Sequence, residues 1–132
     1  MKKHILPAAA GILLGLTGSA VAATYNCLPV EIYEETNRFH VLCGEPKPEE
    51  GGYPSDGSDR IRYFAVPKSD NDFAKRFKYI TQTALIAGLV VQFQYTSGDT
   101  SGTAFDCAAN NCRKPGAFGL LAPASEVRIP FE

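Results

Sequence analysis

The sequence predicts a mainly β protein with one helix, which we interpret as a five-stranded OB-fold-like barrel in the order β-β-β-α-β-β. Two observations favour this class. Short segments with alternating apolar residues lie on both sides of a long segment with helical spacing, and that segment follows the third predicted strand. The alternative is a small α+β sheet with a helix on one face, since the order of strands along a chain does not fix their order in a sheet.

The chain begins with the features of a secretory signal peptide. Two lysines precede an apolar run over residues 5–18, and small residues follow up to Ala22. We expect residues 1–22 to be removed, with cleavage after Ala23 as the alternative, and residues 23–132 to form one exported domain, periplasmic or secreted. The apolar run is too short to span a membrane and no second run follows, so we expect no membrane anchor.

The cysteines support export. All four lie after the expected cleavage site: Cys27, Cys43, Cys107 and Cys112. An even number of cysteines in an exported chain indicates disulfide bonds, because the compartment beyond the inner membrane is oxidising. The last two close a short loop, so we pair them with each other and pair the first two. A zinc site would require C-x-x-C spacing, which is missing, and we expect no metal and no cofactor.

Three strands are predicted before the helix. Residues 30–33 and 38–43 alternate between apolar and polar side chains and are separated by a turn, which predicts a hairpin. Residues 44–59 contain three prolines and predict an exposed loop. Residues 60–66 predict the third strand. The expected apolar faces comprise Val30 and Ile32, then Phe39, Val41 and Cys43, then Ile61, Tyr63 and Ala65.

The apolar spacing then changes from two residues to three and four. Phe73, Phe77, Ile80, Ala84 and Leu85 form the apolar stripe of an amphipathic helix predicted over residues 70–87. Ser69 or Asp70 can cap its first turn, and Gly88 ends it. Residues 89–95 predict a fourth strand, residues 97–115 a loop closed by the second disulfide, and residues 117–121 and 126–131 one or two further strands.

The helix ending in Ala84-Leu85-Ile86-Ala87-Gly88, followed by Val90-Val91-Gln92-Phe93-Gln94-Tyr95, resembles the corresponding stretch in the B subunits of the subtilase-cytotoxin and typhoid-toxin group. A disulfide near the first strands and a short Cys-x4-Cys loop late in the chain add to this likeness. The resemblance implies a small secreted OB-fold that forms a glycan-binding pentamer. It assigns no sugar-binding role to any position of this sequence, which also lacks tryptophan.

Charge and composition argue against two functional classes. The chain has 13 basic and 14 acidic residues, and without Lys2 and Lys3 it has 11 and 14, a net charge of −3. Nucleic-acid binding requires a surplus of basic residues on one face, so we expect no nucleic-acid partner. The expected mature chain has one histidine, His40, and no Gly-x-Ser-x-Gly elbow, so the sequence does not indicate an enzyme.

The candidate ligand-binding residues fall on two surfaces. The outward face of the predicted strands carries Tyr33, Arg38, His40, Arg62, Gln92 and Gln94, and the disulfide-closed loop carries Asp99, Thr100, Asp106, Asn110 and Arg113. Rings for stacking, together with hydrogen-bonding groups, suit a sugar or a peptide. A solvent-facing sheet and loop would carry similar residues without binding anything.

Three functional hypotheses follow. The first is an exported, non-catalytic binding module that recognises a glycan, a peptide or a protein partner. The second is a structural or receptor-binding subunit of a toxin-like homo-oligomer, as the resemblance implies. The third is a small secreted hydrolase, which would depend on His40 as its base.

Overall fold

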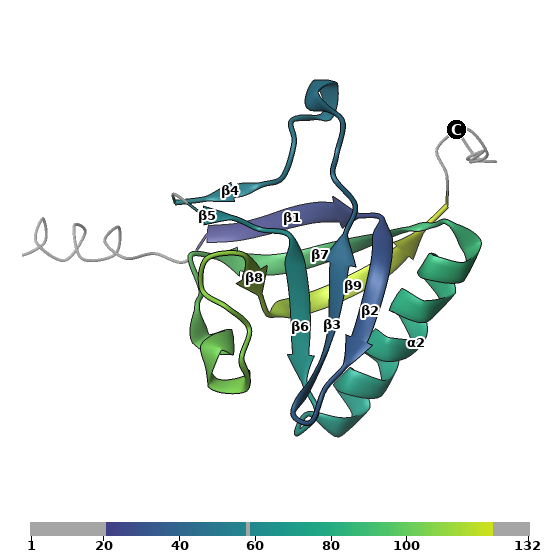
Figure 1. Cartoon of the computed structure of the whole chain (residues 1–132), viewed down its shortest axis with the longest axis vertical. Helices are drawn as coiled ribbons and strands as arrows, with labels where there is room; N and C mark the ends of the chain where they lie inside the picture. Colours follow the sequence, from purple (N-terminus) through teal and green to yellow (C-terminus); the bar gives the residue numbers. More distant parts are fainter. Residues whose placement is uncertain (1–20, 58, 123–132) are drawn as a thin grey trace, which may run out of the picture.

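The computed structural model describes residues 21–57 and 59–122, and these form a mainly β structure with one long helix (Figure 1). The strands are β1 (Val21–Cys27), β2 (Pro29–Glu34), β3 (Arg38–Cys43), β4 (Ser55–Asp56), β5 (Asp59–Arg60), β6 (Tyr63–Pro67), β7 (Val90–Ser97), β8 (Cys112–Arg113) and β9 (Pro115–Leu121). The helix is α2 (Asn71–Ala87), and the short 3-10 helices are η1 (Pro48–Glu50) and η2 (Ser101–Phe105). The expected signal peptide up to residue 20 and the expected strand at 126–131 lie outside the described residues.

The strands form two main sheets and a small ribbon. The first sheet has the order β1-β7-β9 and is antiparallel, and the second has the order β2-β3-β6-β8, in which β8 runs parallel to β6. The chain crosses between these sheets at Leu28 and at Lys114, because β1 leads directly into β2 and β8 into β9. Both sheets are open, and their hydrogen bonds do not close one barrel.

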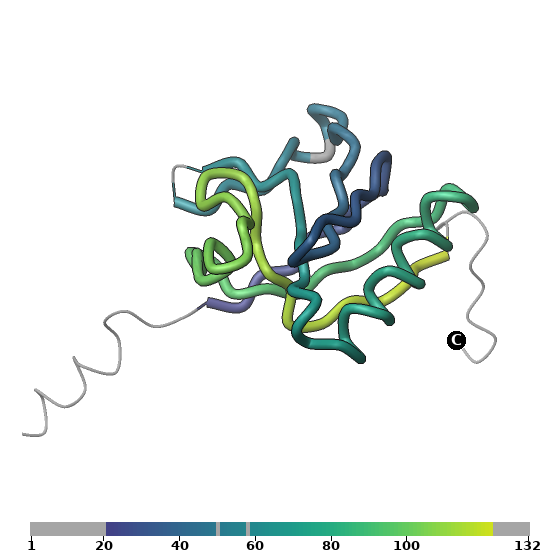
Figure 2. The backbone as a smooth tube through the Cα atoms, turned by 60° about the horizontal axis from the view of Figure 1, so that its bottom comes forward, coloured from purple at the N-terminus to yellow at the C-terminus, as the bar shows by residue number. Residues whose placement is uncertain are grey.

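Helix α2 packs against both main sheets. It contacts β2, β3 and β6 of the second sheet and β7 and β9 of the first, and Figure 2 shows it lying along β9. The predicted helix is confirmed to within one residue, and Gly88 ends it with a left-handed φ of 70° while its amide donates to the Ala84 carbonyl. Asp70 precedes the helix, but its side chain makes no capping hydrogen bond.

The buried face of α2 differs in part from the predicted stripe. Phe77 and Ala84 are buried as expected, whereas Leu85 is 38 % exposed. Thr81 is buried in its place, and its hydroxyl donates to the carbonyl of Phe77 at 2.8 Å. A threonine can replace an apolar residue at this position because the helix backbone satisfies its hydroxyl.

Aromatic rings fill the space between the sheets and the helix. Phe64 of β6 stacks on Phe93 of β7 with 4.4 Å between ring centroids, and Phe118 of β9 contacts both Phe77 and Phe93. Each partner comes from a different element, so these rings join the sheets to the helix. Burying one such side chain contributes about 1.5–3 kcal/mol.

Two predicted strand faces are corrected by the structure. Phe64 and Val66 of β6 face the main core, while Tyr63 and Ala65 pack against the loop closed by the second disulfide. Both faces of β6 are therefore covered, and alternation alone could not identify the core face. Val30, predicted to be inward, is 50 % exposed, and a register shift between Pro29 and Glu31 accounts for this change of direction.

The predicted disulfide pairing is confirmed. The Cys27–Cys43 bond joins the end of β1 to the end of β3, and the Cys107–Cys112 bond closes the loop that packs against β6. β1 includes Val21 and Ala22, which the expected cleavage would remove. Within the described ranges, the structure has no helix long and apolar enough to span a membrane.

Candidate functional site

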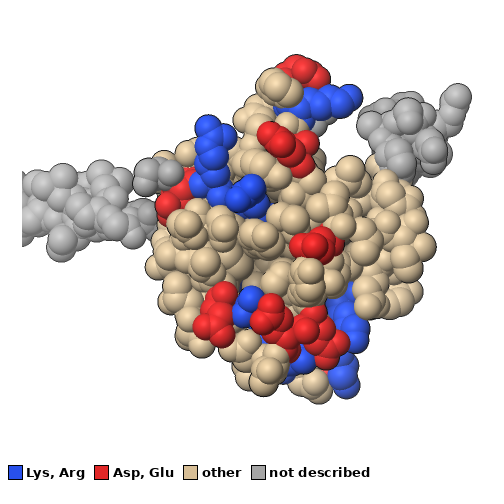
Figure 3. Space-filling view, in the orientation of Figure 1, with Lys and Arg blue, Asp and Glu red and all other residues tan. Residues whose placement is uncertain are grey.

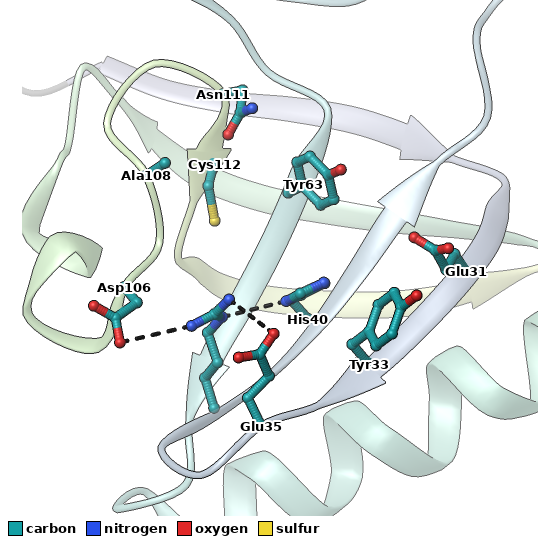
Figure 4. Close-up of a pocket in the computed structure, with 10 residues that line it drawn as sticks. Glu31, Tyr33, Glu35, His40, Tyr63, Asp106, Ala108, Asn111 and Cys112 are labelled. Atoms are coloured by element: carbon teal, nitrogen blue, oxygen red, sulfur yellow. Dashed lines mark hydrogen bonds and ion pairs between the residues drawn. The ribbon is translucent and has the colours of Figure 1, made fainter.

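A cavity of about 290 Å³ opens on the outer face of the second sheet, beside the disulfide-closed loop (Figure 4). The sheet and its β2–β3 turn contribute Glu31, Tyr33, Glu35, Arg38, His40 and Tyr63, and the loop and β8 contribute Asp106, Ala108, Asn111 and Cys112. Four of the candidate residues, Tyr33, Arg38, His40 and Asp106, are thus brought together. They come from both surfaces that the sequence indicates, and they form one site.

A row of three rings forms the floor of this cavity. Tyr33 lies opposite His40 in the pairing of β2 with β3, with 5.3 Å between their ring centroids. On the other side, Tyr63 meets His40 edge to face at 5.4 Å. Because Tyr33 is about half exposed, at 49 %, its ring offers a surface on which a ligand can stack.

Arg38 connects the sheet to the loop. Its guanidinium forms an ion pair with Glu35 at 3.3 Å and lies 3.8 Å from the Asp106 carboxylate. The Asp106 carboxylate also accepts a hydrogen bond from the side-chain amide of Asn37 at 2.9 Å. These contacts join the loop side of the cavity to β3.

The surroundings of His40 favour its neutral form. Burial is the main cause that lowers the pKa of its imidazole below the usual value, and the charge of Arg38 lowers it further. Glu35 and Glu31 act in the opposite direction but more weakly. The Arg38 Nε–H donates to His40 Nδ1 at 3.2 Å, so the ring proton is assigned to Nε2.

The loop wall is closely packed. Gly102 of η2 is buried against the second disulfide, and a Cβ at this position would lie 2.8 Å from Cys107 Cβ. Asp106 follows η2 with a left-handed φ of 68°, a conformation that aspartate tolerates better than most residues. The loop therefore presents Asp106 from a closely packed turn.

Arg113 is the clearest correction among the candidate residues. The sequence predicts it on an exposed loop, but its side chain is only 1 % exposed. Its Nε donates to the Asp56 carboxylate at 2.7 Å, and its Nη2 lies 3.2 Å from the Asp59 carboxylate. Its Nη1 donates to the backbone carbonyls of Ala109 and Cys112, both at 2.7 Å. Arg113 is in the loop sequence, yet it points into the protein because the β4–β5 ribbon supplies its counter-charges.

The other candidates lie away from the cavity. Gln92 and Gln94 project from β7 in the first sheet, where the Gln92 amide donates to Asn26 at 3.2 Å. Arg62 lies over the ring of Tyr53 at 5.8 Å, and Asp99 accepts a hydrogen bond from the Ser101 amide at 2.9 Å. Thr100 and Asn110 are exposed and do not line the cavity.

Sequence reasoning missed Glu31, Glu35, Tyr63 and Asn111 as cavity residues. Glu31 shares the outward face of β2 with Tyr33, and Glu35 lies three residues before Arg38, with which it forms an ion pair. These two cavity residues could therefore have been predicted from their neighbours in the sequence. No local sequence pattern indicated Tyr63 and Asn111, because their positions in the cavity depend on the packing of the loop against β6. The buried Asp56 was also missed, since its partner Arg113 is 57 residues away in the chain.

No serine or threonine is among the lining residues of the cavity, and Cys112 is held in a disulfide. Across the described residues there is no group of three or more His, Cys, Asp or Glu side chains that could hold a metal ion. Comparison with family models and with curated proteins gives no match to the chain.

Proposed function

We propose that the protein is an exported, non-catalytic binding module that holds one projecting group of a glycan, a peptide or a protein partner in the cavity around His40. The observation that carries this proposal is the row of Tyr33, His40 and Tyr63 rings, bordered by charged and amide side chains. Ligand sites combine such apolar surfaces with a few polar groups. A volume of about 290 Å³ suits one sugar ring or one side chain.

Rigidity supports the same proposal. The Cys107–Cys112 bond closes the loop that forms one wall, and the ion pairs of Arg38 tie that wall to β3. A site that is already ordered loses little conformational entropy when a ligand binds. The two disulfides also support export to an oxidising compartment, as the signal peptide indicates.

We further propose that the fold is a variant of the OB-fold. β1 and β2 can be counted as one bent strand, and so can β8 and β9. The pairing of strands then runs from β2 through β3 and β6 to β8, and it continues from β9 through β7 to β1. The helix then lies between the third and fourth strands. OB-folds bind ligands on the face of their second and third strands, here β3 and β6, where the cavity opens.

A receptor-binding subunit of a toxin-like homo-oligomer is the second candidate function. It is favoured by large apolar side chains that are exposed in the single chain, among them Leu28, Val30 and Ile86. Sedimentation analysis of the purified protein would show a concentration-dependent oligomer if this candidate is correct. A monomer at all accessible concentrations would contradict it.

The binding function is tested with a glycan array and a peptide library, followed by titration of each ligand found. We expect Tyr33→Ala and His40→Ala to weaken binding by about tenfold or more, because each removes one ring of the site. Tyr79→Ala is the matched control, since Tyr79 lies on α2, is 69 % exposed and does not line the cavity. Equal binding by all three variants, or no ligand in either screen, would contradict the proposal.

A further inference from the structure

We infer that the group held in the cavity is a cation, the side chain of a lysine or arginine on a peptide or protein partner. This inference rests on the binding function proposed above and names the chemical class of the ligand. It follows from the charge balance of the cavity, from the position of its rings and from its size.

The cavity has an excess of negative charge. Three carboxylates line it, those of Glu31, Glu35 and Asp106, and apart from the imidazole of His40 the one basic side chain among the lining residues is that of Arg38. Arg38 is shared between Glu35 and Asp106. Two negative charges therefore remain without a counter-charge inside the cavity.

Glu31 is the carboxylate available to a ligand. Within the described part of the chain it takes part in no ion pair, and it lies next to the half-exposed ring of Tyr33 (Figure 4). The neighbouring Glu34 is different, because Lys68 and Lys78 bind its carboxylate at 2.9 and 3.3 Å. Those two lysines are occupied outside the cavity and do not line it.

The carboxylates give the cavity itself a negative sign. On the face seen in Figure 3, acidic groups gather near the end of β2 and the start of β3, and basic groups lie beside them and higher on the same face. A field of one sign attracts ligands of the opposite sign and disfavours those of the same sign. An anionic sugar would therefore meet repulsion at this site.

The rings favour a cation over a neutral polar group. The face of a tyrosine ring attracts an ammonium or guanidinium group, and Tyr33 offers its ring beside the Glu31 carboxylate. The protein already uses such contacts, since Lys68 and Lys78 lie 5.1 and 5.2 Å from the ring centre of Phe39. An aromatic ring next to an unpaired carboxylate gives a basic side chain two favourable contacts at one place.

A peptide is favoured over a glycan as the molecule that carries the bound cation. Lysine and arginine carry their charge on a long, narrow stem, which suits a cavity of about 290 Å³ that opens on a sheet face. Most sugar units are neutral or anionic and would leave the excess charge uncompensated. We therefore assign the cavity to a basic side chain on a peptide.

The test is an NMR titration of the isotope-labelled full mature protein with acetylated, amidated glycine peptides. Their central residue is lysine, arginine, acetyl-lysine, norleucine or glutamate. We expect the lysine and arginine peptides to shift the backbone amides of Tyr33, His40 and Tyr63 with affinities at least about fivefold higher than the neutral peptides. Added salt should weaken this binding.

A matched pair of variants isolates the charge effect. Glu31→Gln should weaken lysine-peptide binding about threefold or more, because it removes the carboxylate that has no ion pair. Glu49→Gln removes an exposed carboxylate in η1, outside the cavity, and should leave binding unchanged. Both variants should melt at the parent temperature, which separates a loss of binding from a loss of fold.

The possible failures can be distinguished. Equal affinity for lysine, acetyl-lysine and norleucine peptides, or tighter binding of the glutamate peptide, overturns the cation inference. N-acetylglucosamine is titrated in parallel, and if it alone shifts the cavity amides in a Tyr33-dependent manner, the binding function stands and the inference fails. If no probe shifts these amides, both are wrong.

Discussion

At the scale of single residues, the most informative side chain is Arg113. Its place in a polar, disulfide-closed loop indicated an exposed ligand contact, but the structure buries it between Asp56 and Asp59. Asp56 is itself 4 % exposed and also accepts hydrogen bonds from the Ser97 hydroxyl and the Gly98 amide. This group of residues connects β8, the β4–β5 ribbon and the turn after β7.

Arg113→Ala should destabilise the protein by about 3–5 kcal/mol, because it leaves the Asp56 carboxylate buried without a counter-charge. Arg76→Ala on the exposed face of α2 is the control, with an expected change within about 0.5 kcal/mol. Urea denaturation measures both free energies of unfolding. Parent-like stability of the Arg113 variant would show that the buried ion pairs are unimportant.

Asp56 makes stability depend on pH. Burial alone would raise the pKa of its carboxyl, but hydrogen bonds from the Gly98 amide, Arg113 and Ser97 outweigh burial and lower it. The folded protein therefore holds this proton less tightly than the unfolded chain, whose aspartate pKa is about 3.9. The stabilisation is present above that value and is lost as pH falls through the lower folded pKa.

Urea denaturation at a series of pH values below 5 tests this dependence. The free energy of unfolding of the parent should fall more steeply with acid than that of Asp56→Asn, which has no carboxyl to titrate. Identical slopes for the two proteins would refute the assignment to Asp56.

At the scale of elements, α2 is the link between the two sheets. The complete burial of Phe77 identifies the apolar stripe of this helix as a core face. Phe77 contacts Phe93 of one sheet strand and Phe118 of another. The helix therefore joins the sheets, and the cavity lies on the opposite side of β3 and β6.

Phe77→Ala should lower the free energy of unfolding by about 3–5 kcal/mol, because it opens a cavity where the aromatic rings meet. Ile86→Ala provides the contrast, since Ile86 lies on the same helix but is 85 % exposed and should change stability little. Thermal and urea denaturation measure the difference. If Phe77→Ala has the same free energy of unfolding as the parent, α2 does not complete the core.

At the scale of the whole molecule, the two disulfides have different roles. Cys27–Cys43 links β1 of the first sheet to β3 of the second across a sequence separation of 16, whereas Cys107–Cys112 spans 5 and fixes one wall of the cavity. The first bond constrains the assembly of the two sheets. The second constrains the shape of the cavity.

Replacing both Cys27 and Cys43 by alanine should cost about 3 kcal/mol of stability in the loop-entropy estimate, and replacing Cys107 and Cys112 about 2 kcal/mol. The second pair of substitutions should also weaken ligand binding, because the wall that carries Asp106 becomes less ordered. Denaturation and ligand titration separate these effects. A larger stability loss for the Cys107–Cys112 variant, with binding intact, would reverse the assignment of roles.

The sequence by itself determined several of the local elements of this protein, although it did not predict β1. Apolar spacing and backbone preferences act between near neighbours. They predict the strand at 38–43, the helix after Asp70, its end at Gly88 and the strand that begins at Val90. The disulfide pairing also followed from separation along the chain. The sequence further indicated Tyr33, Arg38 and His40 as members of one face, because alternation in a strand is a local property.

Only the tertiary structure decided which side chains meet across long separations. It placed Asp106 beside Arg38, turned Arg113 inward to Asp56, and covered both faces of β6 so that Phe64 entered the core. Gln92 and Gln94 belong to the other sheet for the same reason, since their place depends on which strands pair. A charged or amide side chain has no local signal for its partner, because electrostatic and packing energies depend on distance in space and not on separation in sequence.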